Sequence, residues 1–257
     1  MEHIDKMGKI IAIANQKGGV GKTTTAVNLS ASLALNHKRT LVVDFDPQGM
    51  ATIGLGKFKK EKKGIYQALM NGIYMMDLVQ PTELDNLYIC PCSPELAGFE
   101  AEIFSEDKRE TRLRDALVNI KLLFHFIFID CPPSLSFLTI NALTAADSVL
   151  IPIQTEFFCM EGLPDLLRTL DEVRAVLNPS LSVEGIILTM FDERTNLSKQ
   201  VAEEVRNSLG DIIFEVIIPR TVRLAEAPSF GQPIILYDIK SKGAQSYLNL
   251  AREILER

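Results

Sequence analysis

A glycine-rich turn constrains this chain more than any other feature: it joins a short apolar run to a helix-forming segment in KIIAIANQKGGVGKTTT, residues 9–25. The apolar run predicts a buried strand over residues 10–14, and the turn opens into a helix at Lys22. Glycines let the turn curl tightly, and strand, turn and helix in this order direct backbone N–H groups at a phosphate. The sequence therefore predicts a nucleoside-triphosphate site.

The residues of this turn have separate predicted roles. Lys22 places a positive charge on the β- and γ-phosphates, and the Thr23 hydroxyl is a ligand for Mg²⁺. The strict pattern G-x-x-x-x-G-K-[ST] requires glycine where this chain has Gln16, and a second lysine, Lys17, follows it. The predicted nucleotide contacts of the turn are Lys17, Gly18, Gly19, Val20, Gly21, Lys22, Thr23 and Thr24.

Bulk composition narrows the class of protein. A chain of 257 residues that is 47% hydrophobic can bury one substantial core, and its length allows one or two domains. The net charge of −6 means that any DNA binding needs a local basic patch. The sequence has no apolar run of about 18 residues, which a membrane span needs, and no signal-peptide stretch at its start. The cysteines are too scattered for a disulfide framework or a zinc site, so reduced thiols in the cytoplasm are expected: Cys90, Cys92, Cys131 and Cys159.

Strand and helix patterns alternate along the chain. Strands are predicted over residues 40–45, 87–90, 124–130, 148–154, 183–190 and 212–219, and helices over 23–36, 65–78, 96–103, 111–120, 161–177, 198–209 and 243–255. This alternation predicts one doubly wound α/β domain over residues 1–257, with a mostly parallel sheet and helices on both faces. The charged run at 54–64 is interpreted as a solvated loop or as a contact with a partner or DNA.

Three acids follow buried strands. Asp130 ends the strand 124–130, as a Walker B acid does, and is predicted to hold the Mg²⁺ shell opposite Thr23. The alternative is that Asp130 caps the turn before Pro132. Asp44 and Asp46 stand two residues apart at the end of the strand 40–45, so they lie on one face of an extended segment.

ANQKGGVGKTTTAVNLS and the later motifs resemble the ParA/Soj subgroup of the deviant Walker A ATPases, which sorts plasmids and chromosomes, over residues 8–255. The resemblance implies a P-loop NTPase that uses ATP and Mg²⁺. DFDPQG matches the family's switch segment, which implies that Asp46 orients the attacking water beside the metal, while Asp44 is more structural. Lys17 is implied to reach the nucleotide of a second subunit, so that Lys17, Lys22 and Asp46 are the catalytic residues. An ordinary surface lysine is the alternative for Lys17.

The same resemblance places further contacts in the second half of the chain. It implies that Met190, Pro219 and Arg220 lie around adenine, although a proline that ends a strand is commonly only a turn. FDERTNLS and IPRTVRLAEAPSFG resemble the family's DNA-lining segments, which makes Arg194 and Arg223 the leading DNA candidates. The alternative is that these arginines pair with nearby acids, Glu193 or Glu226. From residue 194 onward nine Lys and Arg stand against eight Asp and Glu, so this quarter is the least acidic.

The implied function is ATP-dependent partitioning of DNA. An ATP-bound homodimer binds DNA non-specifically at the nucleoid, and a ParB-like centromere-binding protein stimulates slow hydrolysis. The P-loop begins about ten residues from the start, which leaves no room for an N-terminal helix-turn-helix. The main alternative is a MinD-like positioning ATPase on a membrane, but residues 243–255 have acids beside their arginines and are interpreted as the edge of the core. An iron–sulfur reductase using Cys131 and a scaffold that uses ATP only to dimerise are further alternatives.

Overall fold

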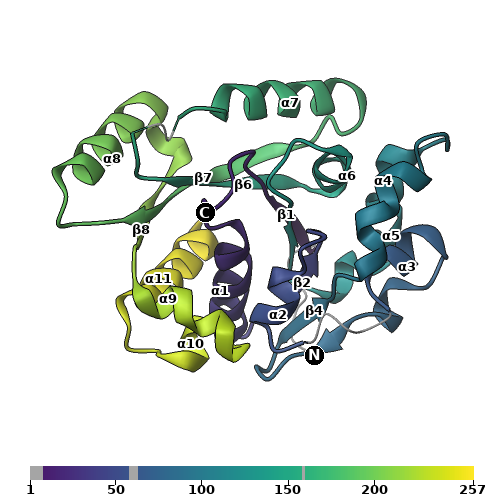
Figure 1. Ribbon diagram of the computed structural model, residues 1–257, viewed down its shortest axis with the longest axis horizontal. Coiled ribbons are helices and arrows are strands. Elements are labelled where there is room, and N and C mark those ends of the chain that lie inside the picture. The colour runs from purple at the N-terminus through teal and green to yellow at the C-terminus, as the bar shows by residue number, and fades with distance from the viewer. Residues whose placement is uncertain (1–7, 58–62, 158–159) are drawn as a thin grey trace.

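The described residues, 8–57, 63–157 and 160–257 of a computed structural model, form one eight-stranded sheet in the order β3-β4-β2-β5-β1-β6-β7-β8 (Figure 1). Every strand pair is parallel except β3 with β4. The strands are β1 (Lys9–Ile13), β2 (Thr40–Asp44), β3 (Gln80–Pro81), β4 (Leu87–Cys90), β5 (Phe126–Asp130), β6 (Ser148–Gln154), β7 (Ser182–Phe191) and β8 (Ile213–Pro219). The predicted doubly wound α/β fold with a mostly parallel sheet is confirmed.

Helices cover both faces of the sheet, with α7 on one side of β6 and β7 and α1 and α11 on the other (Figure 1). The longer helices are α1 (Lys22–Leu35), α6 (Phe137–Ala145), α7 (Leu163–Val176), α8 (Asn196–Leu209) and α11 (Lys242–Glu256). The shorter helices are α2 (Met50–Gly54), α3 (Ile65–Met70), α4 (Phe99–Glu102), α5 (Arg112–Leu117), α9 (Val222–Glu226) and α10 (Ile234–Tyr237).

Alternate side chains of the central strands enter two separate cores. Ile11 and Ile13 of β1 join the core beneath α1 and α11, whereas Ile10 and Ala12 join the core beneath α3 to α8. Strands that are buried on both faces read as continuous apolar runs because neither side of the sheet meets water. The apolar run at residues 10–14 was therefore a reliable strand signal.

Three predicted helices are shorter than expected. The helix predicted over 65–78 ends at Met70, because Asn71 leads into Gly72, whose φ of 65° is left-handed. Only a 3₁₀ turn, Met75–Asp77, follows it. The segment 96–103 is a 3₁₀ turn, Pro94–Gly98, followed by α4, and the segment 111–120 contains the two-turn helix α5.

The short helices α2, α9 and α10, the helix α6 and the strand β3 were not predicted. Gly54 of the charged run belongs to α2, and residues 58–62 of that run lie outside the described residues. Cys90, Cys92 and Cys131 are buried and free, and Cys159 also lies outside the described residues. None of the described helices is both long enough and apolar enough to cross a membrane.

The two outer strands offer little backbone for further pairing. β3 has only two residues, runs antiparallel and ends at Pro81, which has no N–H. On β8 the Glu253 carboxylate accepts hydrogen bonds from the N–H groups of Glu215 and Val216, at 2.8 and 3.1 Å. Arg206 donates to the Glu215 carbonyl at 2.8 Å. Side chains from α8 and α11 therefore use the outward backbone groups of β8.

Candidate nucleotide-binding site

The predicted phosphate loop follows β1 at the carboxyl end of the sheet and leads into α1. Gly19 and Gly21 have φ of 75° and 91°, a left-handed backbone that glycine adopts without strain. The Thr25 N–H already bonds to the Gly21 carbonyl, at 2.8 Å. Within the described residues, the backbone N–H groups of residues 18–24 donate to no protein acceptor. This stretch is a cradle of free donors at a helix N-terminus, which suits an anion.

The two lysines of the loop are placed differently. The Lys22 side chain is buried, and its ammonium donates to the Lys17 carbonyl at 3.1 Å. Burial lowers the pKa of Lys22, although the charges of Asp130 and Asp46 act in the opposite direction. The Lys17 side chain is 38% exposed, and its ammonium lies 4.0 Å from the Glu156 carboxylate. Lys22 thus points into the loop, whereas Lys17 lies at its rim.

Two predicted acids lie side by side beneath the loop. β2 and β5 are neighbours, and their register pairs Asp44 with Asp130. The Asp130 side chain is fully buried, and neither of its carboxylate oxygens has a donor in good hydrogen-bond geometry, although the Thr23 hydroxyl is close enough to favour the charged form. Burial, followed by the charge of Asp44, raises the pKa of Asp130, and Thr23 and Lys22 oppose this rise. An orphaned buried carboxylate is costly unless a cation or donor joins it.

The Asp44 carboxylate is held from one side. Its Oδ2 accepts hydrogen bonds from the Thr52 N–H and hydroxyl, at 2.7 and 2.6 Å, and its Oδ1 has no partner. Burial raises the pKa of Asp44 to about 6, and the Thr52 hydrogen bonds act against this rise. The Thr52 hydroxyl in turn accepts from the Cys92 N–H at 3.0 Å. These contacts tie α2 to the ends of β2 and β4, a structural role that fits the expectation for Asp44.

The donor set suits a cation that is held jointly with phosphate oxygens. In the part of the chain that the structure describes, no three His, Cys, Asp or Glu residues are grouped as ligands for a metal. Mg²⁺ commonly takes only one or two protein ligands and completes its shell with water and phosphate. The unpaired carboxylate of Asp130 fits this pattern, with the Thr23 hydroxyl beside it on α1.

Two cavities join at this end of the sheet. One, of about 320 Å³, is lined by Asp46 and Pro133 and by five residues of the loop: Gly19, Gly21, Lys22, Thr23 and Thr24. The other, of about 470 Å³, lies between the loop, the ends of β7 and β8 and helix α11. Gly21, Thr24 and Met190 line both cavities. One nucleotide could therefore extend through both cavities, with its phosphates beside Lys22 and its base in the larger cavity.

The structure brings most predicted nucleotide contacts to these cavities. Met190, Pro219 and Arg220 line the larger cavity, as does Arg194, which was predicted for DNA. Asp46 lines the smaller one, and its Oδ1 accepts from the Gln48 N–H at 2.9 Å. The three loop residues that line neither cavity are Lys17, Gly18 and Val20. The roles of all these residues in binding stay predictions.

Sequence reasoning missed the residues that hold the loop from behind. The Thr189 hydroxyl donates to the Val20 carbonyl at 2.8 Å, and the Gln154 amide donates to the Gly19 carbonyl at 2.8 Å. The Gln154 amide also contacts the Met190 sulfur, and Met190 has a left-handed φ of 53°, which is uncommon for a residue with a side chain. Thr189 and Gln154 lie at the carboxyl ends of β7 and β6, and this position was the available signal.

Both predicted DNA arginines form ion pairs in the structure. Arg194 is 83% exposed and pairs with Asp192 at 2.7 Å, not with Glu193 as the alternative stated. Arg223 pairs with Glu226 at 3.2 Å and with Asp238 at 3.6 Å. These are exposed pairs, which contribute little stability and exchange easily.

Comparison with known proteins decides the family. The chain matches a family model described as an AAA domain over residues 8–183. It is 57% identical to the chromosome partitioning protein ParA of Myxococcus xanthus, over 98% of this chain and 89% of that protein. It is 53% identical to the sporulation initiation inhibitor protein Soj of Bacillus subtilis, over 96% and 98%. This chain belongs to the ParA/Soj family of chromosome-partitioning ATPases.

A solved structure extends the likeness to the family's ligands. Cobyrinic acid a,c-diamide synthase from Mycobacterium smegmatis, with a bound ATP analogue and magnesium, superposes with a TM-score of 0.86. The two chains are 35% identical, and the match covers 97% of this ParA/Soj-family chain and 94% of the synthase. The resemblance read from the KGGVGKTTT segment is therefore confirmed at the level of family and fold.

Two alternatives lose support from the geometry. The apolar side chains of α11, including Tyr247, Leu250 and Ile254, are buried against the core, so this helix does not present them to a membrane. Cys131 is fully buried, and burial raises the pKa of its thiol. A bridging cluster ligand would need an accessible thiolate instead.

Proposed function

We propose that this chain binds ATP and Mg²⁺ in the two joined cavities and, as an ATP-dependent homodimer, binds DNA without sequence preference. Hydrolysis, stimulated by a ParB-like centromere-binding protein, releases the DNA and so segregates a chromosome or plasmid. The observation that carries the proposal is the opposite placement of the two loop lysines. Lys22 is buried at the phosphate cavity of its own chain, whereas the partly exposed Lys17 lines neither cavity. A cation at the rim is placed to serve a second subunit.

Each group of residues around the cavities has its own proposed role in ATP hydrolysis. The free N–H groups of residues 18–24 and the Lys22 ammonium hold the phosphates, and Thr23 and Asp130 would hold Mg²⁺. Mg²⁺ neutralises charge on the phosphates when it is bound. Asp46 lines the phosphate cavity and orients the attacking water. Lys17 of one subunit supplies charge to the transferring phosphoryl group of the other, as an arginine finger does, so the chain is an ATPase and not only a scaffold.

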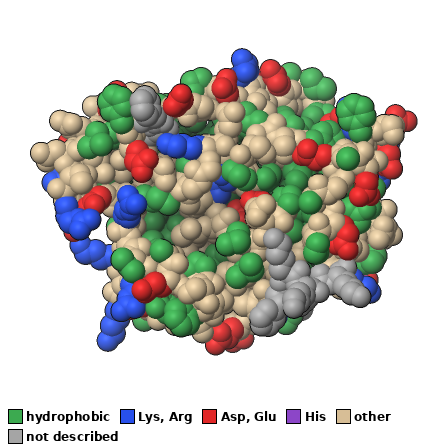
Figure 2. All heavy atoms as spheres, in the orientation of Figure 1, with side chains coloured by type: hydrophobic (Ala, Val, Ile, Leu, Met, Phe, Trp, Pro, Cys, Tyr) green, Lys and Arg blue, Asp and Glu red, His purple; other side chains and the backbone are tan. Residues whose placement is uncertain are grey.

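The base and the DNA would share one region of the molecule. Met190, Pro219 and Arg220 surround the larger cavity, which would take adenine. Lys and Arg side chains gather on the left of the face in Figure 2, over β8, α8, α9 and α11. Arg194 and Arg223 lie in this region, and phosphates would replace the acids with which they now pair. Contacts to phosphates alone give affinity without sequence preference.

The test is DNA retention measured with ATP, with ADP and without nucleotide, alongside sedimentation of the same samples. Wild type is expected to dimerise and retain DNA only with ATP. Lys17→Ala is expected to bind ATP but to form no dimer and retain no DNA. Arg194→Glu is expected to dimerise, to retain at least about tenfold less DNA and to show a flatter salt dependence, because each lost phosphate contact removes one released counterion.

Arg168→Glu is the matched control, because Arg168 is also an exposed arginine paired with an acid, Asp165, but lies on α7, on the other side of the sheet from α11 (Figure 1). It is expected to behave as wild type. Vesicles of anionic lipid in place of DNA separate this function from a membrane-bound one. An ATP-loaded monomer that retains DNA as well as wild type does would refute the proposal.

A further inference from the structure

A third cavity, of about 450 Å³, lies at the amino end of the sheet, where β1 and β5 begin and α11 ends. We call it the amino-end pocket. The nucleotide cavities lie at the opposite, carboxyl end of the same strands. Small-molecule pockets have volumes of about 300 to 1,000 Å³, so the amino-end pocket is large enough for a ligand of its own. The proposed function does not use it.

Positive charge gathers at this pocket from four separate segments. Lys9 comes from β1, Lys38 from the turn after α1, Lys121 from the turn before β5, and Arg257 follows α11. Asp147 is the one acid among the residues that line it. This local excess of cations stands out in a chain with a net charge of −6.

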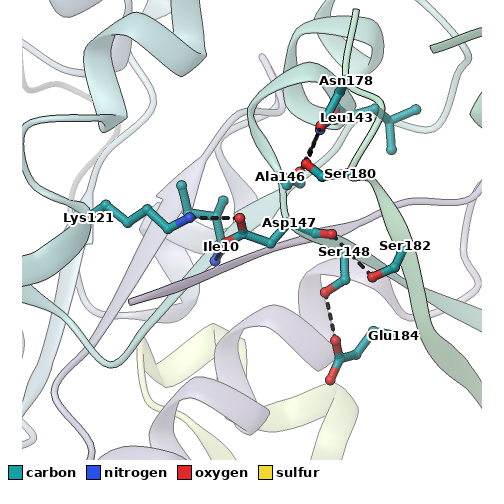
Figure 3. A network of polar contacts seen from close by, with 10 residues as sticks. All are labelled: Ile10, Lys121, Leu143, Ala146, Asp147, Ser148, Asn178, Ser180, Ser182 and Glu184. Atoms are coloured by element: carbon teal, nitrogen blue, oxygen red, sulfur yellow. Dashed lines mark hydrogen bonds and ion pairs between the residues drawn. The ribbon is translucent and has the colours of Figure 1, made fainter. Parts of the chain in front are cut away.

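Three of these cations are fixed by partners and form the frame of the pocket. Lys9 pairs with Glu184 and Lys121 with Asp147, each at 2.7 Å, while Arg257 pairs with Glu253 at 2.9 Å. Figure 3 shows the Lys121 ammonium directed at Asp147, which also accepts from the Ile10 N–H, at 2.8 Å. The frame is therefore rigid and already in place.

Two donors of the pocket remain available to a ligand. The Lys38 ammonium has no ion-pair partner among the described residues. The Nδ1 of His125 accepts a hydrogen bond from the Arg39 N–H at 3.0 Å, so its proton is on Nε2 and that N–H is a donor. Both residues line the pocket, so an acidic group that enters it meets two unused donors.

The rest of the wall is apolar and comes from Phe126, Ile254 and Leu255. Phe126 stacks on Phe128, with ring centroids 6.2 Å apart, which fixes that side of the wall. We propose that the amino-end pocket binds a small organic anion that has an apolar body and one acidic group. The acidic group would lie at Lys38 and His125, and the body against Phe126 and Leu255.

The test uses the fluorescent aromatic sulfonate 1-anilinonaphthalene-8-sulfonate on full-length protein with ADP and Mg²⁺ present, which keeps the nucleotide cavities filled. Wild type is expected to bind the probe saturably at one site, and 1-naphthoate is expected to displace it. Lys38→Glu is expected to weaken binding at least about fivefold, since an acid replaces the free cation. Lys38→Arg, which keeps the charge, is expected to bind as wild type does.

Lys199→Glu is the matched control, because it makes the same change of charge at an exposed position of α8. It is expected to leave probe affinity unchanged. Equal affinities in Lys38→Glu and Lys199→Glu, or binding that never saturates, would overturn the proposal. Displacement by inorganic phosphate as effectively as by 1-naphthoate would also overturn it, because the apolar wall would then contribute nothing.

Discussion

At the carboxyl end of the sheet, the fully buried Asp130 has no donor in good hydrogen-bond geometry for either carboxylate oxygen, whereas at the amino end Asp147 uses both of its oxygens. One oxygen of Asp147 accepts from the Ile10 N–H and the other from Lys121, at 2.8 and 2.7 Å (Figure 3). Its backbone also bonds to Ile10 and to Ser182 of β7. Asp147, directly before β6, therefore ties β6 to β1 and β7, while the Asp130 carboxylate makes no such link.

The two ends of the sheet differ in the free-energy cost of their unpaired polar groups. Unsatisfied buried carboxylate oxygens cost free energy, and among the described residues those of Asp44 and Asp130 lie at the carboxyl end of the sheet. At the amino end Asp147 and its partners form a closed network that fixes the strands, whereas the unpaired carboxylate oxygens project from the other ends of the strands. The following predictions test this division with matched changes at the two ends.

The largest effect is expected for Asp130→Asn. An amide cannot balance the charge of a cation as a carboxylate does, so Mg²⁺-dependent ATP hydrolysis should fall about 100-fold or more. The thermal midpoint of the Mg²⁺-free protein should not fall, because the amide removes a buried charge that has no partner. Hydrolysis assays and calorimetry on the same preparation check both expectations. Wild-type hydrolysis by the variant would contradict the metal-holding role.

A smaller effect concerns pH. Burial raises the pKa of Asp44 from 3.8 to about 6 in the folded protein, so between these values the folded state holds a proton that the unfolded chain releases. The contribution of Asp44 to the free energy of unfolding of Mg²⁺-free protein, measured as the difference from Asp44→Asn, should therefore be highest below pH 4 and fall by about 3 kcal/mol as pH rises past 6. Urea titrations across this range measure the difference. Parallel curves for the two proteins would count against it.

The smallest effect is expected at the amino end, for Asp147→Asn. The amide keeps an acceptor for the Ile10 N–H but loses the charge that pairs with Lys121. Because both side chains are partly exposed, the expected loss is about 1 kcal/mol, or about 2 to 4 °C in the thermal midpoint, with hydrolysis unchanged. Asp165→Asn, which breaks an exposed pair with Arg168, should change nothing measurable. A loss of ATP hydrolysis in Asp147→Asn would contradict the assignment of a purely structural role to the amino end.

Local patterns made the loop and the acids predictable. A buried run, glycines and Lys22 specify a strand, turn and helix from adjacent residues alone, and Asp130 ends an apolar run of the same kind. The contact between Thr189 and Val20 joins residues 169 positions apart, and no local pattern reports it. The helix α6 was missed because most of its residues are buried, including the polar Thr139, Asn141 and Thr144, so polar and apolar residues do not separate onto two faces.

The closed outer strands have a consequence for self-association. An exposed strand invites a second copy to continue the sheet across the boundary between molecules. Here Pro81 ends one outer strand, and the carboxylate of Glu253 occupies the amides of the other. Two copies would have to associate through side chains and loops. Such a dimer can dissociate without breaking backbone hydrogen bonds between strands of the two subunits.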